Sequence, residues 1–88
     1  MRIEKKVWPE YFQKVSSGEK NFEFRLADFE CSSGDVLVLK EYDPKTKSYT
    51  GRSVERKVTY VTKIDAEKFY AKDAIAKYGL QIISFRPD

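Results

Sequence analysis

The sequence predicts a small α+β domain in which five short strands and two helices form a partly closed β-barrel, with antiparallel or mixed strand pairing. Two observations predict this class. Several short segments alternate apolar with polar residues, as half-buried strands do, and two others repeat apolar residues at helical spacing. The predicted order is strand, helix, strand, hairpin, helix, strand. We expect residues 1–88 to form one domain around one modest core.

The N-terminal segment predicts an edge strand over residues 2–8, because its alternation of apolar and charged residues is imperfect. Pro9 ends that strand and suits the first turn of a helix. The helix carries an apolar stripe, and Gly18 is expected to end it in the left-handed conformation. The residues of the stripe are Tyr11, Phe12 and Val15.

Residues 20–26 predict a second strand directly after this helix. Large apolar side chains occupy one face of such a strand, and charged side chains occupy the other. The apolar residues are Phe22, Phe24 and Leu26, and the charged residues are Glu23 and Arg25, with Lys20 just before them. We expect the apolar residues to fix this strand to the core beside the first helix.

A β-hairpin is predicted over residues 36–62. Residues 36–42 are apolar on both faces at their start, which is typical of a central strand. A loop beginning with Asp43 and Pro44 follows, and residues 52–62 return as a long strand.

A helical pattern follows the hairpin, with Asp65 as its expected cap and Gly79 at its end. Asp73 can start a second short helix, so a broken helix is an alternative. Residues 80–85 predict a last strand. The helical stripe, which we expect to be core packing, consists of Ala66, Phe69, Tyr70, Ala74 and Tyr78.

The composition excludes several kinds of site. The chain has no histidine and one cysteine, Cys31, so it can form neither an internal disulfide nor a Cys/His zinc site nor a Ser-His pair. We therefore expect no cofactor and no metal. The longest apolar run is far shorter than the ~20 residues of a membrane span, and the N-terminus lacks the apolar core of a signal peptide. The expected location is cytoplasmic, without a membrane partner. The net charge of +3 permits nucleic acid as a partner.

The segment Gly18-x-Lys20-x-x-Glu23-x-Arg25 resembles the G-x-K-x-x-E-x-R motif of ASCH domains, which belong to the PUA-like β-barrel superfamily. Further segments resemble blocks of that family, one of them from a small uncharacterised branch, so the likeness covers about residues 3–62. The resemblance implies a pseudo-barrel with a cleft beside the first helix. It also implies binding of RNA, a nucleotide or a modified nucleoside.

Some proteins of that superfamily are amidohydrolases that remove an acyl group from a modified cytidine. In them a lysine at the position of Lys20 activates a threonine at the position of Glu23. Glutamate replaces that threonine here, and Ile3 stands where the branch often has a histidine. This departure favours recognition over hydrolysis, and an enzyme with Lys20 and Glu23 rearranged as acid and base is the alternative.

The expected ligand-binding residues are Lys20, Glu23, Arg25, Asp28, Trp8 and Tyr42. Glu23 and Arg25 share a strand face, so they form either a solvated salt bridge or the wall of a cleft. In a cleft, Arg25 can hold a phosphate or carboxylate, and Glu23 can accept hydrogen bonds from the exocyclic amine of a base. Asp28 either pairs with Arg25 or caps a turn.

Basic residues with two tyrosines among them cluster on the hairpin, which suits single-stranded RNA, although a solvated hairpin has the same pattern. These residues are Lys40, Lys45, Lys47, Arg52, Arg56 and Lys57, with Tyr42 and Tyr49. The leading hypothesis is an RNA- or nucleotide-binding module without catalysis. A protein-interaction domain that uses an edge strand or the hairpin is a further alternative.

Overall fold

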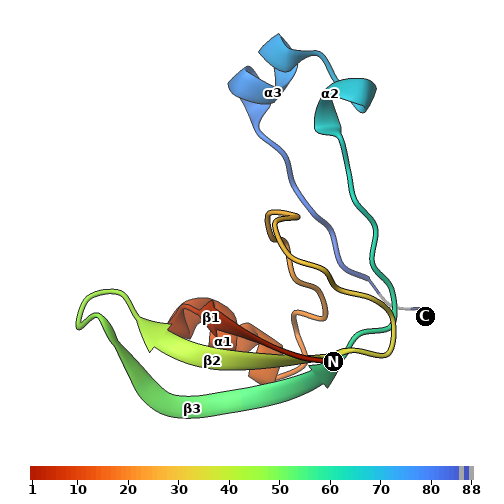
Figure 1. Cartoon of the computed structure of the whole chain (residues 1–88). Helices are drawn as coiled ribbons and strands as arrows, with labels where there is room; N and C mark the ends of the chain where they lie inside the picture. The colour runs from red at the N-terminus through yellow and green to blue at the C-terminus, as the bar shows by residue number, and fades with distance from the viewer. Residues whose placement is uncertain (86, 88) are drawn as a thin grey trace.

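The computed structural model describes residues 1–85 and 87, which form a three-stranded sheet, one helix packed on it and an arm with two short helices (Figure 1). The domain is therefore of the α+β class, as the sequence predicts. Its elements are β1 (Arg2–Val7), α1 (Pro9–Ser16), β2 (Val36–Asp43), β3 (Ser48–Lys57), α2 (Ala66–Phe69) and α3 (Lys72–Tyr78).

The sheet is mixed, with the order β1-β2-β3. Strand β1 runs parallel to β2, with Lys5 opposite Leu39, and β3 pairs with β2 in the antiparallel direction. A register shift falls between Lys40 and Tyr42. This order confirms that β1 is an edge strand and that β2, the most apolar strand, is central. The predicted hairpin is also present, although β3 begins at Ser48 and ends at Lys57.

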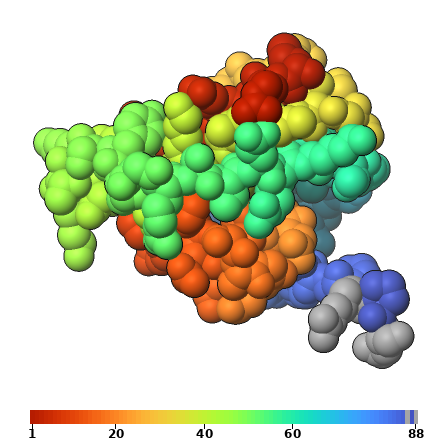
Figure 2. Space-filling view, turned by 90° about the horizontal axis from the view of Figure 1, so that it is seen from below, coloured from red at the N-terminus to blue at the C-terminus, as the bar shows by residue number. Residues whose placement is uncertain are grey.

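Helix α1 covers one face of the sheet and makes the core there. Its buried residues Phe12 and Val15 pack with Val7 of β1 and Leu39 of β2. Figure 2 shows β3 lying across the molecule beside the side chains of α1 and the segment that follows it. Gly18 adopts a φ of 85°, which confirms the left-handed end of the helix, and its amide donates to the carbonyl oxygen of Val15.

The face of the sheet opposite α1 carries charged side chains. Successive residues of a strand point to opposite sides, so the sequence neighbours of the core residues lie on this face. Arg2 of β1 pairs with Glu55 of β3 at 2.6 Å. Glu4 of β1 pairs with Lys40 of β2 at 3.1 Å. This face, which we call the polar face, therefore links all three strands through ion pairs.

Two of the predicted strands are wrong. Residues 20–26 and 80–85 are not strands in the structure, and the described residues do not close a barrel. The expected apolar attachment of the first segment is also wrong, since Phe24 is 69% exposed and Leu26 is 81% exposed. The physical reason is that alternation describes side chains alone, whereas a strand needs a partner for its backbone hydrogen bonds.

The segment after β3 forms an arm that carries α2 and α3 away from the sheet (Figure 1). The helix is broken as the alternative foresaw, but Ala71 rather than Asp73 precedes its second part. Neither short helix has a buried residue. The predicted core stripe is therefore wrong, because Phe69, Tyr70 and Tyr78 are exposed.

Candidate functional site

The three charged residues of the motif form one network after α1. The Glu23 carboxylate accepts a hydrogen bond from the Lys20 ammonium at 3.1 Å and another from Arg25 Nε at 2.9 Å. Lys20 also donates to the carbonyl oxygen of Phe22 at 3.0 Å. The side chain of Glu23 is only 15% exposed, so this carboxylate is shielded between two cations. The expected salt bridge is present, with Lys20 as its third member.

Arg25 attaches this network to the sheet. Its guanidinium donates through Nη2 to the backbone carbonyl oxygen of Lys6 on β1. Alternate carbonyl groups of an edge strand have no partner within the sheet, so this contact satisfies one of them. The backbone amide of Lys20 donates to the carbonyl oxygen of Lys14 at 2.9 Å, which places the motif beside α1 as expected.

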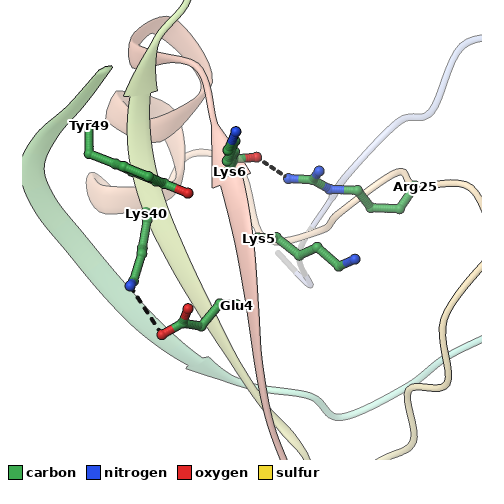
Figure 3. Close-up of a pocket in the computed structure, with 6 residues that line it drawn as sticks. All are labelled: Glu4, Lys5, Lys6, Arg25, Lys40 and Tyr49. Atoms are coloured by element: carbon green, nitrogen blue, oxygen red, sulfur yellow. Dashed lines mark hydrogen bonds and ion pairs between the residues drawn. The ribbon is translucent and has the colours of Figure 1, made fainter. Parts of the chain in front are cut away.

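A pocket of about 360 Å³ lies where Arg25 meets the strands (Figure 3). Four of its side chains are cationic, one is a carboxylate and one is a phenol. We call it the basic pocket. It is lined by Glu4, Lys5, Lys6, Arg25, Lys40 and Tyr49.

Aromatic rings adjoin the cations of the basic pocket. The Lys6 ammonium lies 4.4 Å from the ring centroid of Tyr42 and 5.7 Å from that of Tyr49. The two tyrosine rings pack edge to face at 5.3 Å. In Figure 3, Lys40 and Tyr49 lie on one side of β1, and Arg25 and Lys5 lie on the other. In such an arrangement the cationic side chains can bind a phosphate, and the aromatic rings can stack against a base.

The structure brings together only some of the predicted ligand-binding residues. Arg25 lines the basic pocket, and Tyr42 lies beside it through Lys6. Glu23 contacts Arg25 and Lys20 contacts Glu23, but neither Lys20 nor Glu23 lines the basic pocket. Asp28 is exposed, and within residues 1–85 and 87 its side chain shows neither an ion pair with Arg25 nor a capping hydrogen bond.

Trp8 lines a second pocket, of about 330 Å³, at the end of β1. Trp8 is 50% exposed, and its ring stacks on Tyr11 with the ring centroids 6.4 Å apart. Asp43 in this pocket accepts a hydrogen bond from the backbone amide of Lys45 at 2.9 Å. We call this the Trp8 pocket. It is lined by Trp8, Pro9, Glu10, Asp43, Pro44 and Lys45.

The basic residues of the hairpin do not act as one surface. Lys40 lines the basic pocket, whereas Arg56 donates to the carbonyl oxygen of Val15 in α1. Arg52 pairs with Glu41, with Nε and Nη2 donating to its two oxygens at 2.9 and 2.8 Å. Two of the six basic residues therefore hold the hairpin against α1 and the core.

Sequence reasoning missed the role of Glu41, which is 2% exposed. Hydrogen bonds from Arg52, and then from Thr50, lower the pKa of its carboxyl group. The guanidinium carbon of Arg52 also lies 5.0 Å from the ring centroid of Phe12. The signal was the order Leu37, Leu39, Glu41, since a charge at the third position of a core face requires a partner.

Among the described residues, no group of three or more acidic or cysteine side chains could hold a metal ion. Over the same residues, no helix is long and apolar enough to cross a membrane.

The fold and the site define a small α+β domain with a basic, tyrosine-lined pocket at the edge of a mixed sheet. Residues 4–76 match the family described as "Domain of unknown function (DUF3850)", and the chain belongs to this family. The "Uncharacterized 12.9 kDa protein in GpA 3'region" of Escherichia phage P2 is 41% identical over 59 residues. The alignment covers 67% of this chain and 52% of the phage protein, so the chain spans about half the length of that curated relative.

Proposed function

We propose that this domain binds single-stranded RNA or a nucleotide in the basic pocket. The observation that carries the proposal is that one open pocket extends around the edge of β1, lined by Lys40 and Tyr49 on one side of the strand and by Arg25 on the other (Figure 3). Cationic side chains attract a phosphate, and an aromatic ring offers a surface for a base. The network of Glu23 with Lys20 and Arg25 contributes by fixing the guanidinium before a ligand arrives.

The likeness of the motif to ASCH domains supports the same function, since it implies an RNA-related ligand near the same arginine. On this proposal the family of this chain is related to the ASCH domains. The geometry refines what the likeness implies. Arg25 contacts the ligand, and Lys20 and Glu23 position Arg25.

Binding is favoured over the amidohydrolase alternative by the contacts of Lys20. Its ammonium donates to the Glu23 carboxylate and to the Phe22 carbonyl oxygen. A general acid and a general base must both reach the substrate, whereas Lys20 and Glu23 are engaged with Phe22, Arg25 and each other and do not line the basic pocket. We expect no hydrolysis of an acylated cytidine, measured by chromatography of the nucleoside products. Turnover that disappears in Lys20→Ala would establish the enzyme instead.

Binding is also favoured over the addition of a partner's strand at β1. A peptide that extends the sheet at this edge would need the carbonyl oxygen of Lys6, which Arg25 already occupies, so strand addition would have to use the other edge, β3. Tight binding of a protein that is unchanged when Arg25 and Lys6 are substituted would favour the interaction-domain alternative.

The test of the proposed function is a titration with short single-stranded RNAs and with mononucleotides, followed by backbone amide chemical shifts. We expect shifts in β1, in residues 20–28 and around Lys40 and Tyr49. Lys6→Gln should weaken binding roughly tenfold, as loss of one charge-assisted contact does, and should reduce the salt dependence by about 0.7 in the log–log slope.

The matched control is Lys68→Gln, which removes the same charge from α2 on the arm and should leave the affinity unchanged. Thermal melts of both variants separate a loss of binding from a loss of folding. If no RNA or nucleotide shifts the pocket amides, the proposed function is wrong.

A further inference from the structure

The two pockets follow one another along the same pair of strands. Lys6 of the basic pocket and Trp8 of the second pocket are two residues apart on an extended backbone, a step of roughly 6.6 Å. On β2, Lys40 lines the first pocket and Asp43 lines the second. Tyr42 lies between them in the chain and contacts Lys6. A short oligonucleotide is therefore long enough to reach both pockets.

The pockets differ in the sign of their charge. The basic pocket has four cationic side chains against one carboxylate, whereas the Trp8 pocket has two carboxylates, Glu10 and Asp43, against Lys45. The first suits a phosphate. The second repels a phosphate and suits a neutral group that can donate hydrogen bonds.

The walls of the Trp8 pocket suit a flat ring. Trp8 is half exposed although Tyr11 stacks on its ring, and Pro9 and Pro44 add apolar surface. Stacking of a base on an aromatic side chain contributes about 1–3 kcal/mol. Glu10 and Asp43 at the rim are acceptors for the exocyclic amine of such a base.

We propose that the Trp8 pocket is a base subsite that continues the basic pocket and prefers an amine-bearing base, cytosine or adenine, over uracil. This inference rests on the proposed function, because the phosphate in the basic pocket delivers the neighbouring base to Trp8. Cytosine presents an amine donor to the carboxylates. Uracil presents a carbonyl oxygen at the same position, which the carboxylates repel.

The experiment uses the fluorescence of Trp8, which is the single tryptophan of the chain. The probes are tetranucleotides of cytidine and of uridine, two pyrimidines of similar size, each in the ribose and the deoxyribose form. We expect the cytidine probe to quench the emission and to bind about tenfold more tightly than the uridine probe. The deoxyribose forms show whether the polymer is recognised as RNA, since they differ only in the 2′-hydroxyl.

Glu10→Gln tests the role of the carboxylate, because an amide can donate to uracil as well as accept from cytosine. The variant should bring the two affinities to within about twofold of each other. Glu67→Gln, on α2 of the arm, is the matched control and should keep the preference. Thermal melts establish that both variants are folded.

The results separate the subsite from the proposed function. Salt-dependent binding that leaves the Trp8 emission unchanged overturns the subsite and keeps the basic pocket. Equal affinities for the cytidine and uridine probes, with quenching, overturn the base preference. A complete absence of binding overturns the proposed function and the subsite together.

Discussion

Glu41 shows how one residue of the core face determines local structure. It follows Leu37 and Leu39 on the side of β2 that faces α1, and it is almost fully buried there. A buried carboxylate is unfavourable unless it is paired and hydrogen-bonded. The bidentate contact from Arg52 and the hydroxyl of Thr50 meet that requirement and fix β3 against β2.

The pair of Glu41 and Arg52 predicts that the stability of the fold decreases as the pH falls in the acid range. The folded-state pKa of Glu41 lies below its ordinary value of 4.5, so the unfolded state binds more protons in the acid range. The contribution of Glu41 is therefore present above about pH 4.5 and is lost as the pH falls through the folded pKa. We expect Glu41→Gln to lower the urea midpoint at pH 7 and to flatten its fall between pH 5 and pH 2.

The control for this prediction is Glu55→Gln, which removes a carboxylate whose pKa is also lowered, by Arg2, but which lies on the open polar face. Its urea midpoint at pH 7 should stay close to that of the unchanged chain, because an exposed pair is screened by water. Equal losses in the two variants would contradict the special role of Glu41.

At the residue scale, the sequence predicts contacts between side chains that are close in the chain better than contacts between distant segments. Glu23 pairs with Arg25 as predicted, although that prediction assumed a shared strand face and residues 20–26 form no strand. The position of Arg25 against Lys6 was not predictable, because that contact joins segments 19 residues apart through a backbone carbonyl group that no side-chain pattern marks. The two prolines of the Trp8 pocket likewise meet only because the hairpin turn lies beside the start of α1.

Among the elements, α1 illustrates what an apolar stripe can and cannot predict. Phe12 and Val15 are buried, whereas Tyr11 of the same predicted stripe is half exposed and stacks on Trp8. Spacing alone does not separate them, because Tyr11 and Phe12 are adjacent and the sheet covers a narrow arc of the helix.

The different burial of Phe12 and Tyr11 predicts that their substitution destabilises the fold to different extents. Phe12→Ala should destabilise the fold by about 3–5 kcal/mol, because it empties the contact between α1 and the sheet. Tyr11→Ala should lower stability by less than half of that amount, since much of its ring already meets solvent. Urea unfolding followed by circular dichroism measures both. Similar losses would show that Tyr11 belongs to the core.

At the scale of the whole molecule, the prediction of a barrel is wrong because the described residues form a three-stranded sheet that does not close. Strands β1 and β2 lie close to their predicted positions, and β3 spans residues 48–57 instead of 52–62, but closing the barrel required residues 20–26 and 80–85 to pair with them. The first segment instead attaches through Arg25 and Lys20, and the second belongs to the arm. Both carry large apolar side chains, so composition alone could not distinguish an attached loop from a paired strand.

We expect the arm to have a lower local stability than the unit formed by the sheet and α1, and hydrogen exchange can measure the difference. Amides of β2 pair on both sides and lie over the core, so we expect them to exchange only through global unfolding. Amides of α2 and α3 lie in short helices without buried residues, so we expect exchange through local opening with a free energy of about 0–2 kcal/mol.

The same measurement with a bound cytidine tetranucleotide connects the fold with the function. Ligand that binds only the folded form raises the protection of every globally exchanging amide, so β2 should slow further. The arm should stay unchanged, because its helices open without disturbing either pocket. If α2 and α3 slowed as much as β2, the arm would have to close over the ligand, and the two pockets would be part of a larger site.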